Sequence, residues 1–177
     1  MLTRPLACAS ASGITTARTG GSLELYADLN VAKALLQGQV DMAAPGAHLD
    51  AQVAASMISQ YRQNNGLGVV VVDPELMKLA EQQSQAMASR NKMDHDVKAP
   101  LAQRLAAGGY PATLAVENIS AGYHTLAEAF SGWRDSPPHR ENMLKNGVTK
   151  LGIAASYAPN TKYKVFWTLI LASADKR

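Results

Sequence analysis

Residues 151–171, with the sequence LGIAASYAPNTKYKVFWTLIL, contain the pattern that decides the fold. From Leu151 to Tyr157, larger apolar residues alternate with smaller or polar ones, which is the period of a strand with one buried face. Residues 158–161 are typical of a turn. Residues 163–171 are apolar on nearly both faces, and such a strand must be covered on both sides. The stretch therefore predicts an antiparallel hairpin between two layers of helices.

The segments before this hairpin have the signals of helices. Apolar side chains in residues 49–61 recur at helical spacing. Asp73-Pro-Glu starts a second helix, because aspartate caps the free N–H groups and proline suits the first turn. Further helices are expected after Pro100, after the capping box that begins at Thr125, and after Ser136. The fold class predicted is α/β (α+β), a three-layer α-β-α sandwich with a mainly antiparallel central sheet.

Length and composition favour a single domain with an N-terminal extension. Of the 177 residues, 47% are hydrophobic, which suffices for one core. Residues 1–47 are interpreted as a disordered segment with a short helix, and residues 48–177 as the domain. The net charge is only +3 without a dense basic run, so no nucleic-acid partner is expected. No apolar run approaches the ~20 residues of a transmembrane span.

The start of the chain carries its single cysteine, Cys8, so an intrachain disulfide and a cysteine-based zinc site are both excluded. Residues 1–8 resemble the end of a lipoprotein signal, with small or apolar residues before the cysteine. One hypothesis is therefore the remnant of an export signal with Cys8 open to lipidation. The alternative is an unstructured N-terminus with an incidental cysteine, because the apolar stretch is short for a signal peptide.

Three side chains at segment junctions are candidates for chemistry. Glu117 lies inside an apolar run, and a buried carboxylate must be paired, protonated or bound; the alternative is an edge position in water. His139 lies in the first turn of a predicted helix, whose dipole favours a neutral ring able to bind metal. His95 lies between two aspartates. An ordinary surface histidine is the alternative for both imidazoles.

Several pieces of the chain occur in the order found in one superfamily, and together they cover about residues 49–173. That superfamily unites the cysteine-rich secretory proteins, antigen 5 and the plant pathogenesis-related proteins of class 1. The chain resembles a bacterial member of it, also described as an SCP-like extracellular domain. The matching pieces are residues 73–80, Met-Asp-His at 93–95, residues 104–110, Glu-Asn-Ile-Ser-Ala-Gly-Tyr at 117–123, residues 127–133, Ser-Pro-Pro-His-Arg-Glu-Asn-Met-Leu at 136–144, and the strands at 152–155 and 166–169.

The resemblance implies a central cleft that holds histidines and glutamate. His95 matches the family's loop histidine, Glu117 its box glutamate, and His139 the histidine of the bacterial Ser-Pro-x-His-Arg motif. Some members bind a divalent metal between the two histidines. One expectation is therefore a divalent metal, zinc in the first instance, held by His95 and His139 with Glu117 nearby; the alternative is a cleft without a cofactor.

This chain also departs from the family pattern. Animal and plant members carry a second glutamate where this chain has Ser136, and a later strand histidine that is missing here. Glu128 or Glu141 could complete the metal site, but their spacing does not choose between them.

Three functions remain open from the sequence. The first is a non-enzymatic module, extracellular or in the cell envelope, that binds a small lipid, a peptide or a cell-wall fragment. The second is a metal-assisted hydrolase in which Glu117 is the catalytic general base. The third is a pure interaction domain whose polar cleft is structural. The oligomeric state is left open.

Overall fold

The computed structural model describes residues 36, 38–44 and 47–173 of the chain. Cys8, the suggested export-signal remnant and most of the segment 1–47 lie outside the described residues. The described part of that segment touches the domain, because the backbone N–H of Met42 donates to the carbonyl oxygen of His124 over 2.8 Å. The boundary between the segment and the domain stays a prediction.

The central sheet has four strands in the order β1-β3-β4-β2. β3 and β4 form the predicted hairpin, and β2 pairs antiparallel with β4. β1 has only two residues and pairs parallel with β3 at the opposite edge. The prediction of a mainly antiparallel sheet is thus confirmed. The strands are β1 (Val71–Val72), β2 (Ala115–Ala121), β3 (Lys150–Ala158) and β4 (Lys164–Ala172).

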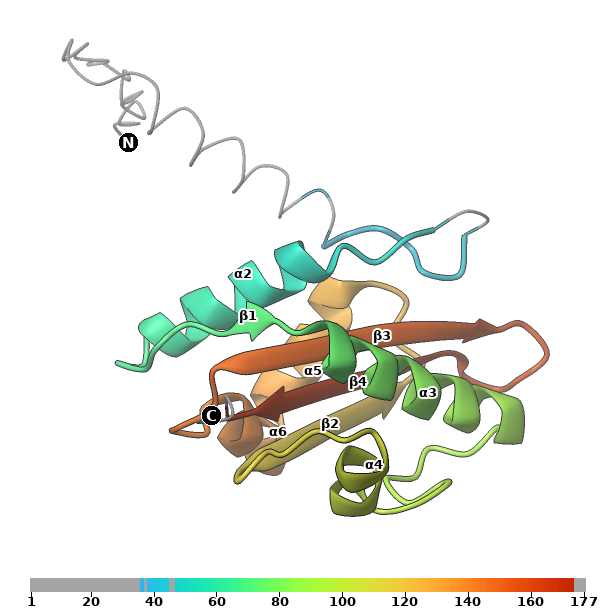
Figure 1. The fold of residues 1–177 in the computed structure, drawn as a ribbon. Coiled ribbons are helices and arrows are strands. Elements are labelled where there is room, and N and C mark those ends of the chain that lie inside the picture. Colours follow the sequence, from blue (N-terminus) through green and yellow to red (C-terminus); the bar gives the residue numbers. More distant parts are fainter. Residues whose placement is uncertain (1–35, 37, 45–46, 174–177) are drawn as a thin grey trace, which may run out of the picture.

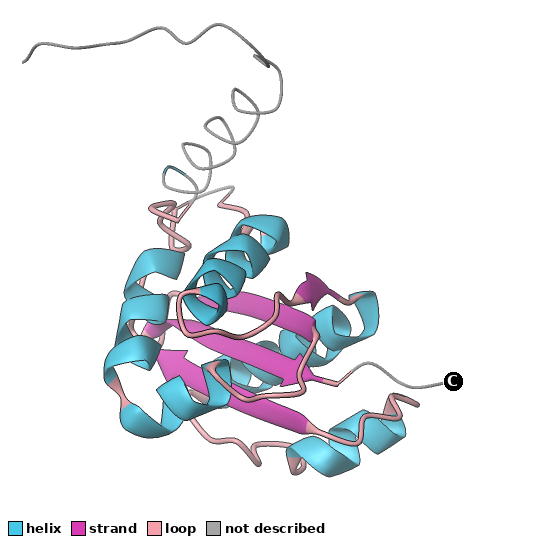
Figure 2. Ribbon diagram, turned by 90° about the vertical axis from the view of Figure 1, so that its left-hand side faces the viewer, coloured by secondary structure: helices cyan, strands magenta, loops and turns pink. Residues whose placement is uncertain are grey.

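Helices cover both faces of this sheet, as the two views show (Figures 1 and 2). In Figure 1, α3 and α4 lie in front of the strands, and α5 and α6 lie behind them. The apolar side chains of α2 share the core on the α5 side. The three-layer sandwich is therefore confirmed. The helices are α2 (Ala51–Gln63), α3 (Pro74–Arg90), α4 (Leu101–Ala107), α5 (Leu126–Asp135) and α6 (Pro137–Met143).

The helix starts follow the capping signals in the sequence. The Asp73 side chain accepts hydrogen bonds from the N–H groups of Glu75 and Leu76, and Pro74 occupies the first turn of α3. At α5 both hydrogen bonds of the capping box between Thr125 and Glu128 are present. These contacts fix the residue at which each of these two helices begins.

Both faces of β4 are buried, which explains its continuous apolar run. Trp167 and Leu169 belong to the core under α2, α5 and α6. Phe166 and Ile170 face the opposite layer and contact residues of α3. Trp133 and Trp167 are 1% and 0% exposed, so their predicted place in the core is confirmed.

Gly152 on β3 sets how closely α3 approaches the sheet. A Cβ atom at this position would lie 2.2 Å from the backbone carbonyl carbon and oxygen of Leu76. Only a residue without a side chain therefore allows this spacing.

We expect Gly152→Ala to lower the free energy of unfolding by about 2–3 kcal/mol or more, because the new methyl group meets backbone that cannot rotate away. Urea denaturation followed by circular dichroism measures the change. Gly68→Ala is the matched control, since a Cβ atom there meets nothing within 4 Å. Equal stability of the two variants would contradict the close packing of α3 on β3.

Candidate functional site

The candidate site is built around Glu117 on the edge strand β2. Glu117 pairs in register with Ile170 of β4, so its side chain points to the face covered by α3 and α4. The residue is 7% exposed. β2 is an edge strand, as one alternative had assumed, but Glu117 is buried rather than solvated.

Both carboxylate oxygens of Glu117 have partners. Arg104 of α4 donates from Nη2 to Oε2 over 2.7 Å, and its side chain is also buried. The other oxygen, Oε1, lies 2.8 Å from Nδ1 of His95, whose side chain is 52% exposed. A buried carboxylate needs such charged or hydrogen-bonded partners, because the low-dielectric interior disfavours an isolated charge.

The hydrogen bond from Glu117 raises the pKa of His95 above its usual value of 6.5, against the opposing effect of partial burial. Arg104 also lowers this pKa, but by a smaller effect than the carboxylate contact. His95 thus holds a proton on Nδ1 toward Glu117, and its Nε2 atom is the ring nitrogen left for another partner.

The loop between α3 and α4 holds His95 in place. Gln83 of α3 donates from Nε2 to the carbonyl oxygens of Asp94 and His95, at 2.8 and 3.0 Å. Arg104 donates from Nε to the carbonyl oxygen of Ala99, over 2.9 Å. Arg104 therefore fixes the loop and the carboxylate together.

His139 reaches the same strand from the opposite layer. Its Nδ1 atom lies 2.8 Å from the hydroxyl oxygen of Ser136, just before α6. Asn118 of β2 donates to the carbonyl oxygen of His139, over 2.8 Å. Asn142 of α6 donates to the carbonyl oxygen of Glu117 and to Oδ1 of Asn118. Partial burial lowers the pKa of His139, and the charge of His95 lowers it further.

The three predicted site residues thus meet at β2 to different degrees. His95 and Glu117 are in direct contact, whereas His139 is joined to the strand through Asn118, and its helix α6 through Asn142. Sequence reasoning missed Arg104 and the two asparagines. For Arg104 a signal was present, because it lies on the inward side of α4 between Leu101 and Leu105 at helical spacing.

Each of the two histidines has one feature that is typical of metal ligands. Metal-binding histidines commonly have their second ring nitrogen held by a carboxylate or another polar group, and His95 and His139 both do. Across the described residues, however, no group of three or more His, Cys, Asp or Glu side chains could hold a metal ion. Glu128 is occupied by the capping box, where its Oε2 accepts from two N–H groups. Glu141 is exposed on α6.

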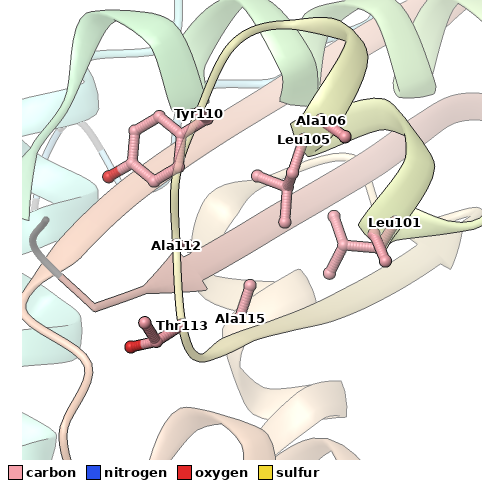
Figure 3. A pocket seen from close by; sticks show the side chains of 8 residues that line it. Leu101, Leu105, Ala106, Tyr110, Ala112, Thr113 and Ala115 are labelled. Carbon is pink, nitrogen blue, oxygen red and sulfur yellow. The ribbon is translucent and has the colours of Figure 1, made fainter.

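A cavity of about 230 Å³ opens beside His139, between β2 and the helices α5 and α6. A second, apolar cavity of about 460 Å³ lies between α4 and the start of β2. Figure 3 shows Leu101 and Leu105 of α4 facing Ala115 across it, with the ring of Tyr110 at one end. Its remaining lining residues are Ala102, Ala106, Ala112 and Thr113.

We expect nuclear magnetic resonance to find His95 titrating above pH 6.5 and His139 below it. The raised pKa of His95 means that its contact with Glu117 stabilises the fold fully below about pH 6.5 and less as the pH rises through the raised value. The stability difference between wild type and His95→Gln should therefore shrink from pH 5.5 to pH 8.5. A constant difference would contradict the pairing.

Among the described residues no helix combines the length and apolar character needed to cross a membrane. Residues 55–171 match the model of the cysteine-rich secretory protein family, CAP. The uncharacterized protein YkwD of Bacillus subtilis is 33% identical over 95 residues, which are 52% of this chain and 37% of that protein.

Two solved structures resemble the fold. An extracellular protein of Bacillus anthracis that contains an SCP domain is 27% identical with a TM-score of 0.61, over 70% of this chain and 40% of that one. An outer surface protein of Borrelia burgdorferi has a TM-score of 0.64 at 17% identity, over 71% and 92% of the two chains. The chain thus spans about two fifths of the length of either Bacillus relative. With the family pattern matched across most of its sheet and helices, this chain belongs to the cysteine-rich secretory protein (CAP) family.

Proposed function

We propose that this chain is an exported CAP-domain protein, extracellular or in the cell envelope, that binds a ligand at the His95–Glu117–His139 site without transforming it. The export part of the proposal is supported by two similar structures, which are described as an extracellular protein and an outer surface protein. The binding part is supported by the hydrogen bonding of Glu117.

The observation that carries the proposal is that both carboxylate oxygens of Glu117 are already paired within a buried site. A general base must present a lone pair to the water that it deprotonates. In Glu117, Oε2 accepts from Arg104 and Oε1 contacts His95. Each oxygen keeps a second lone pair, but the side chain is only 3% exposed, so little of the carboxylate is open to a water molecule. The arrangement is better suited to orienting His95 than to moving a proton.

We further propose that a divalent metal ion, zinc in the first instance, binds between the two histidines. His95 and His139 would hold it through Nε2, because Nδ1 of each ring is already engaged. Glu117 and Ser136 would fix the orientation of the two rings. When bound, the ion would supply a Lewis-acidic position for an oxygen atom of the ligand.

We expect zinc binding, measured by isothermal titration calorimetry, to weaken at least about tenfold in His95→Ala and in His139→Ala. Losing even a hydrogen-bond partner of a metal ligand has that effect. His124→Ala is the matched control, because His124 is a partly exposed histidine that contacts Asp41 instead.

Equal zinc affinity in all four proteins, or none in wild type, would contradict the metal site. Hydrolysis of a peptide or ester panel that is lost in Glu117→Gln would contradict the non-enzymatic role.

The apolar cavity between α4 and β2 supports a small lipid as a second candidate ligand. Seven of its eight lining residues have aliphatic or aromatic side chains, and it lies on the same face of the sheet as Glu117 (Figure 3).

If a lipid binds there, Ala106→Phe should reduce the fluorescence of bound cis-parinaric acid, because the new ring fills the cavity. Ala107→Phe is the control, since Ala107 is the next residue of α4 but does not line this cavity. Equal loss in both variants, or no binding by wild type, would count against the lipid ligand.

A further inference from the structure

Ser120 of β2 is a buried hydroxyl group with no hydrogen-bond partner among the described residues. The residue is 7% exposed, and its Oγ atom contacts no donor or acceptor. Leaving such a group unpaired costs folding free energy, so a buried hydroxyl without a partner needs an explanation. Ser120 lines the cavity of about 230 Å³ beside His139.

The lining of this cavity is polar on one part and apolar on the other, and it is uncharged apart from the imidazole. Ser120, Ser136 and His139 supply hydroxyl groups and a ring nitrogen. The apolar residues are Met93, Ile119, Ala121, Tyr123, Gly132 and Trp133. Because none of the described residues that line the cavity is Lys, Arg, Asp or Glu, a phosphate or an ammonium group would lose hydration without gaining a paired charge.

The size of the cavity restricts the ligand further. At about 30 Å³ per molecule in the liquid, it has room for roughly seven water molecules. The methylene groups of an acyl chain would leave Ser120 unpaired. A small uncharged group with a carbonyl beside a methyl satisfies both parts of the lining.

Close contacts preserve the shape of the apolar wall. A Cβ atom on Gly132 of α5 would lie 2.3 Å from the hydroxyl oxygen of Tyr123. Trp133 is held by its indole N–H, which donates to the carbonyl oxygen of Ile119 over 3.4 Å. The wall is therefore formed before any ligand arrives, which reduces the entropy cost of binding.

We propose that this cavity binds the N-acetyl group of a neutral ligand, with the Ser120 hydroxyl donating to the acetyl carbonyl oxygen and the methyl group against Ile119 and Trp133. This inference rests on the proposed binding function and names its ligand class. The same group occurs in N-acetylated amino sugars and in N-acetylated peptides, so the experiment includes both sources.

The test is a titration of the zinc-free protein, with the indole N–H resonance of Trp133 followed by nuclear magnetic resonance. The probes are N-acetylglucosamine, N-acetylalanine methylamide and glucose, which lacks the acetyl group. We expect a saturable shift with at least one acetylated probe and none with glucose. The acetylated probe that binds more tightly identifies the source.

Two variants decide the role of the hydroxyl group. Ser120→Ala should remain as stable as wild type or become more stable, because it removes an unpaired buried group, but its affinity for the acetylated probe should fall at least about tenfold. Thr168→Val is the matched control. The Thr168 hydroxyl is also buried without a partner, but it does not line the cavity. This variant should bind like wild type.

Three results would overturn the inference: no shift with either acetylated probe, equal affinity for glucose, or unchanged affinity in Ser120→Ala. Zinc binding that still depends on His95 and His139 would then leave the proposed function standing. If the protein binds the acetylated probe but not zinc, the proposed metal site is wrong and the proposed N-acetyl ligand stands.

Discussion

The buried carboxylate of Glu117 is the constraint on which the site depends. An acidic side chain that is 7% exposed on a strand requires compensation, and Arg104 and His95 provide it. Arg104 belongs to α4 and also holds the loop through Ala99, so one guanidinium group ties a helix, a loop and a strand together. Removing only Arg104 or only Glu117 would leave the other charge buried without its partner. This costs more stability than replacing both charged side chains by apolar ones.

The edge position of β2 imposes a second requirement. An unpaired strand edge exposes carbonyl and N–H groups, which proteins commonly cover. Asn142 donates to the carbonyl oxygen of Glu117, and the indole of Trp133 donates to that of Ile119. The same contacts that protect this edge bring α6, and therefore His139, toward the strand that carries Glu117. The residues that cover the edge of β2 therefore also help to assemble the site.

Most of the fold was predictable because its signals are local. The capping box at Thr125, the helix start at Asp73 and the apolar hairpin each depend on residues a few positions apart. The partners of Glu117 were not predictable in the same way, because Arg104 and His95 precede it by 13 and 22 residues and meet it only through the packing of α4 and its loop. The family resemblance supplied His95 and His139, but not the arginine that neutralises their carboxylate.

The hydrogen-bond arrangement also separates two roles that a histidine–glutamate pair can have. A catalytic pair keeps one group free to exchange a proton with the substrate, and that freedom depends on an open lone pair or an exposed hydroxyl. Here the Glu117 side chain is 3% exposed with both oxygens paired, and His139 is held through Ser136 and its own carbonyl oxygen. Among the described residues, one nitrogen of each ring and the buried Ser120 hydroxyl near His139 have no hydrogen-bond partner. Groups fixed in this way lose little further entropy when a partner arrives, so the rigidity that weakens the case for hydrolysis strengthens the case for binding.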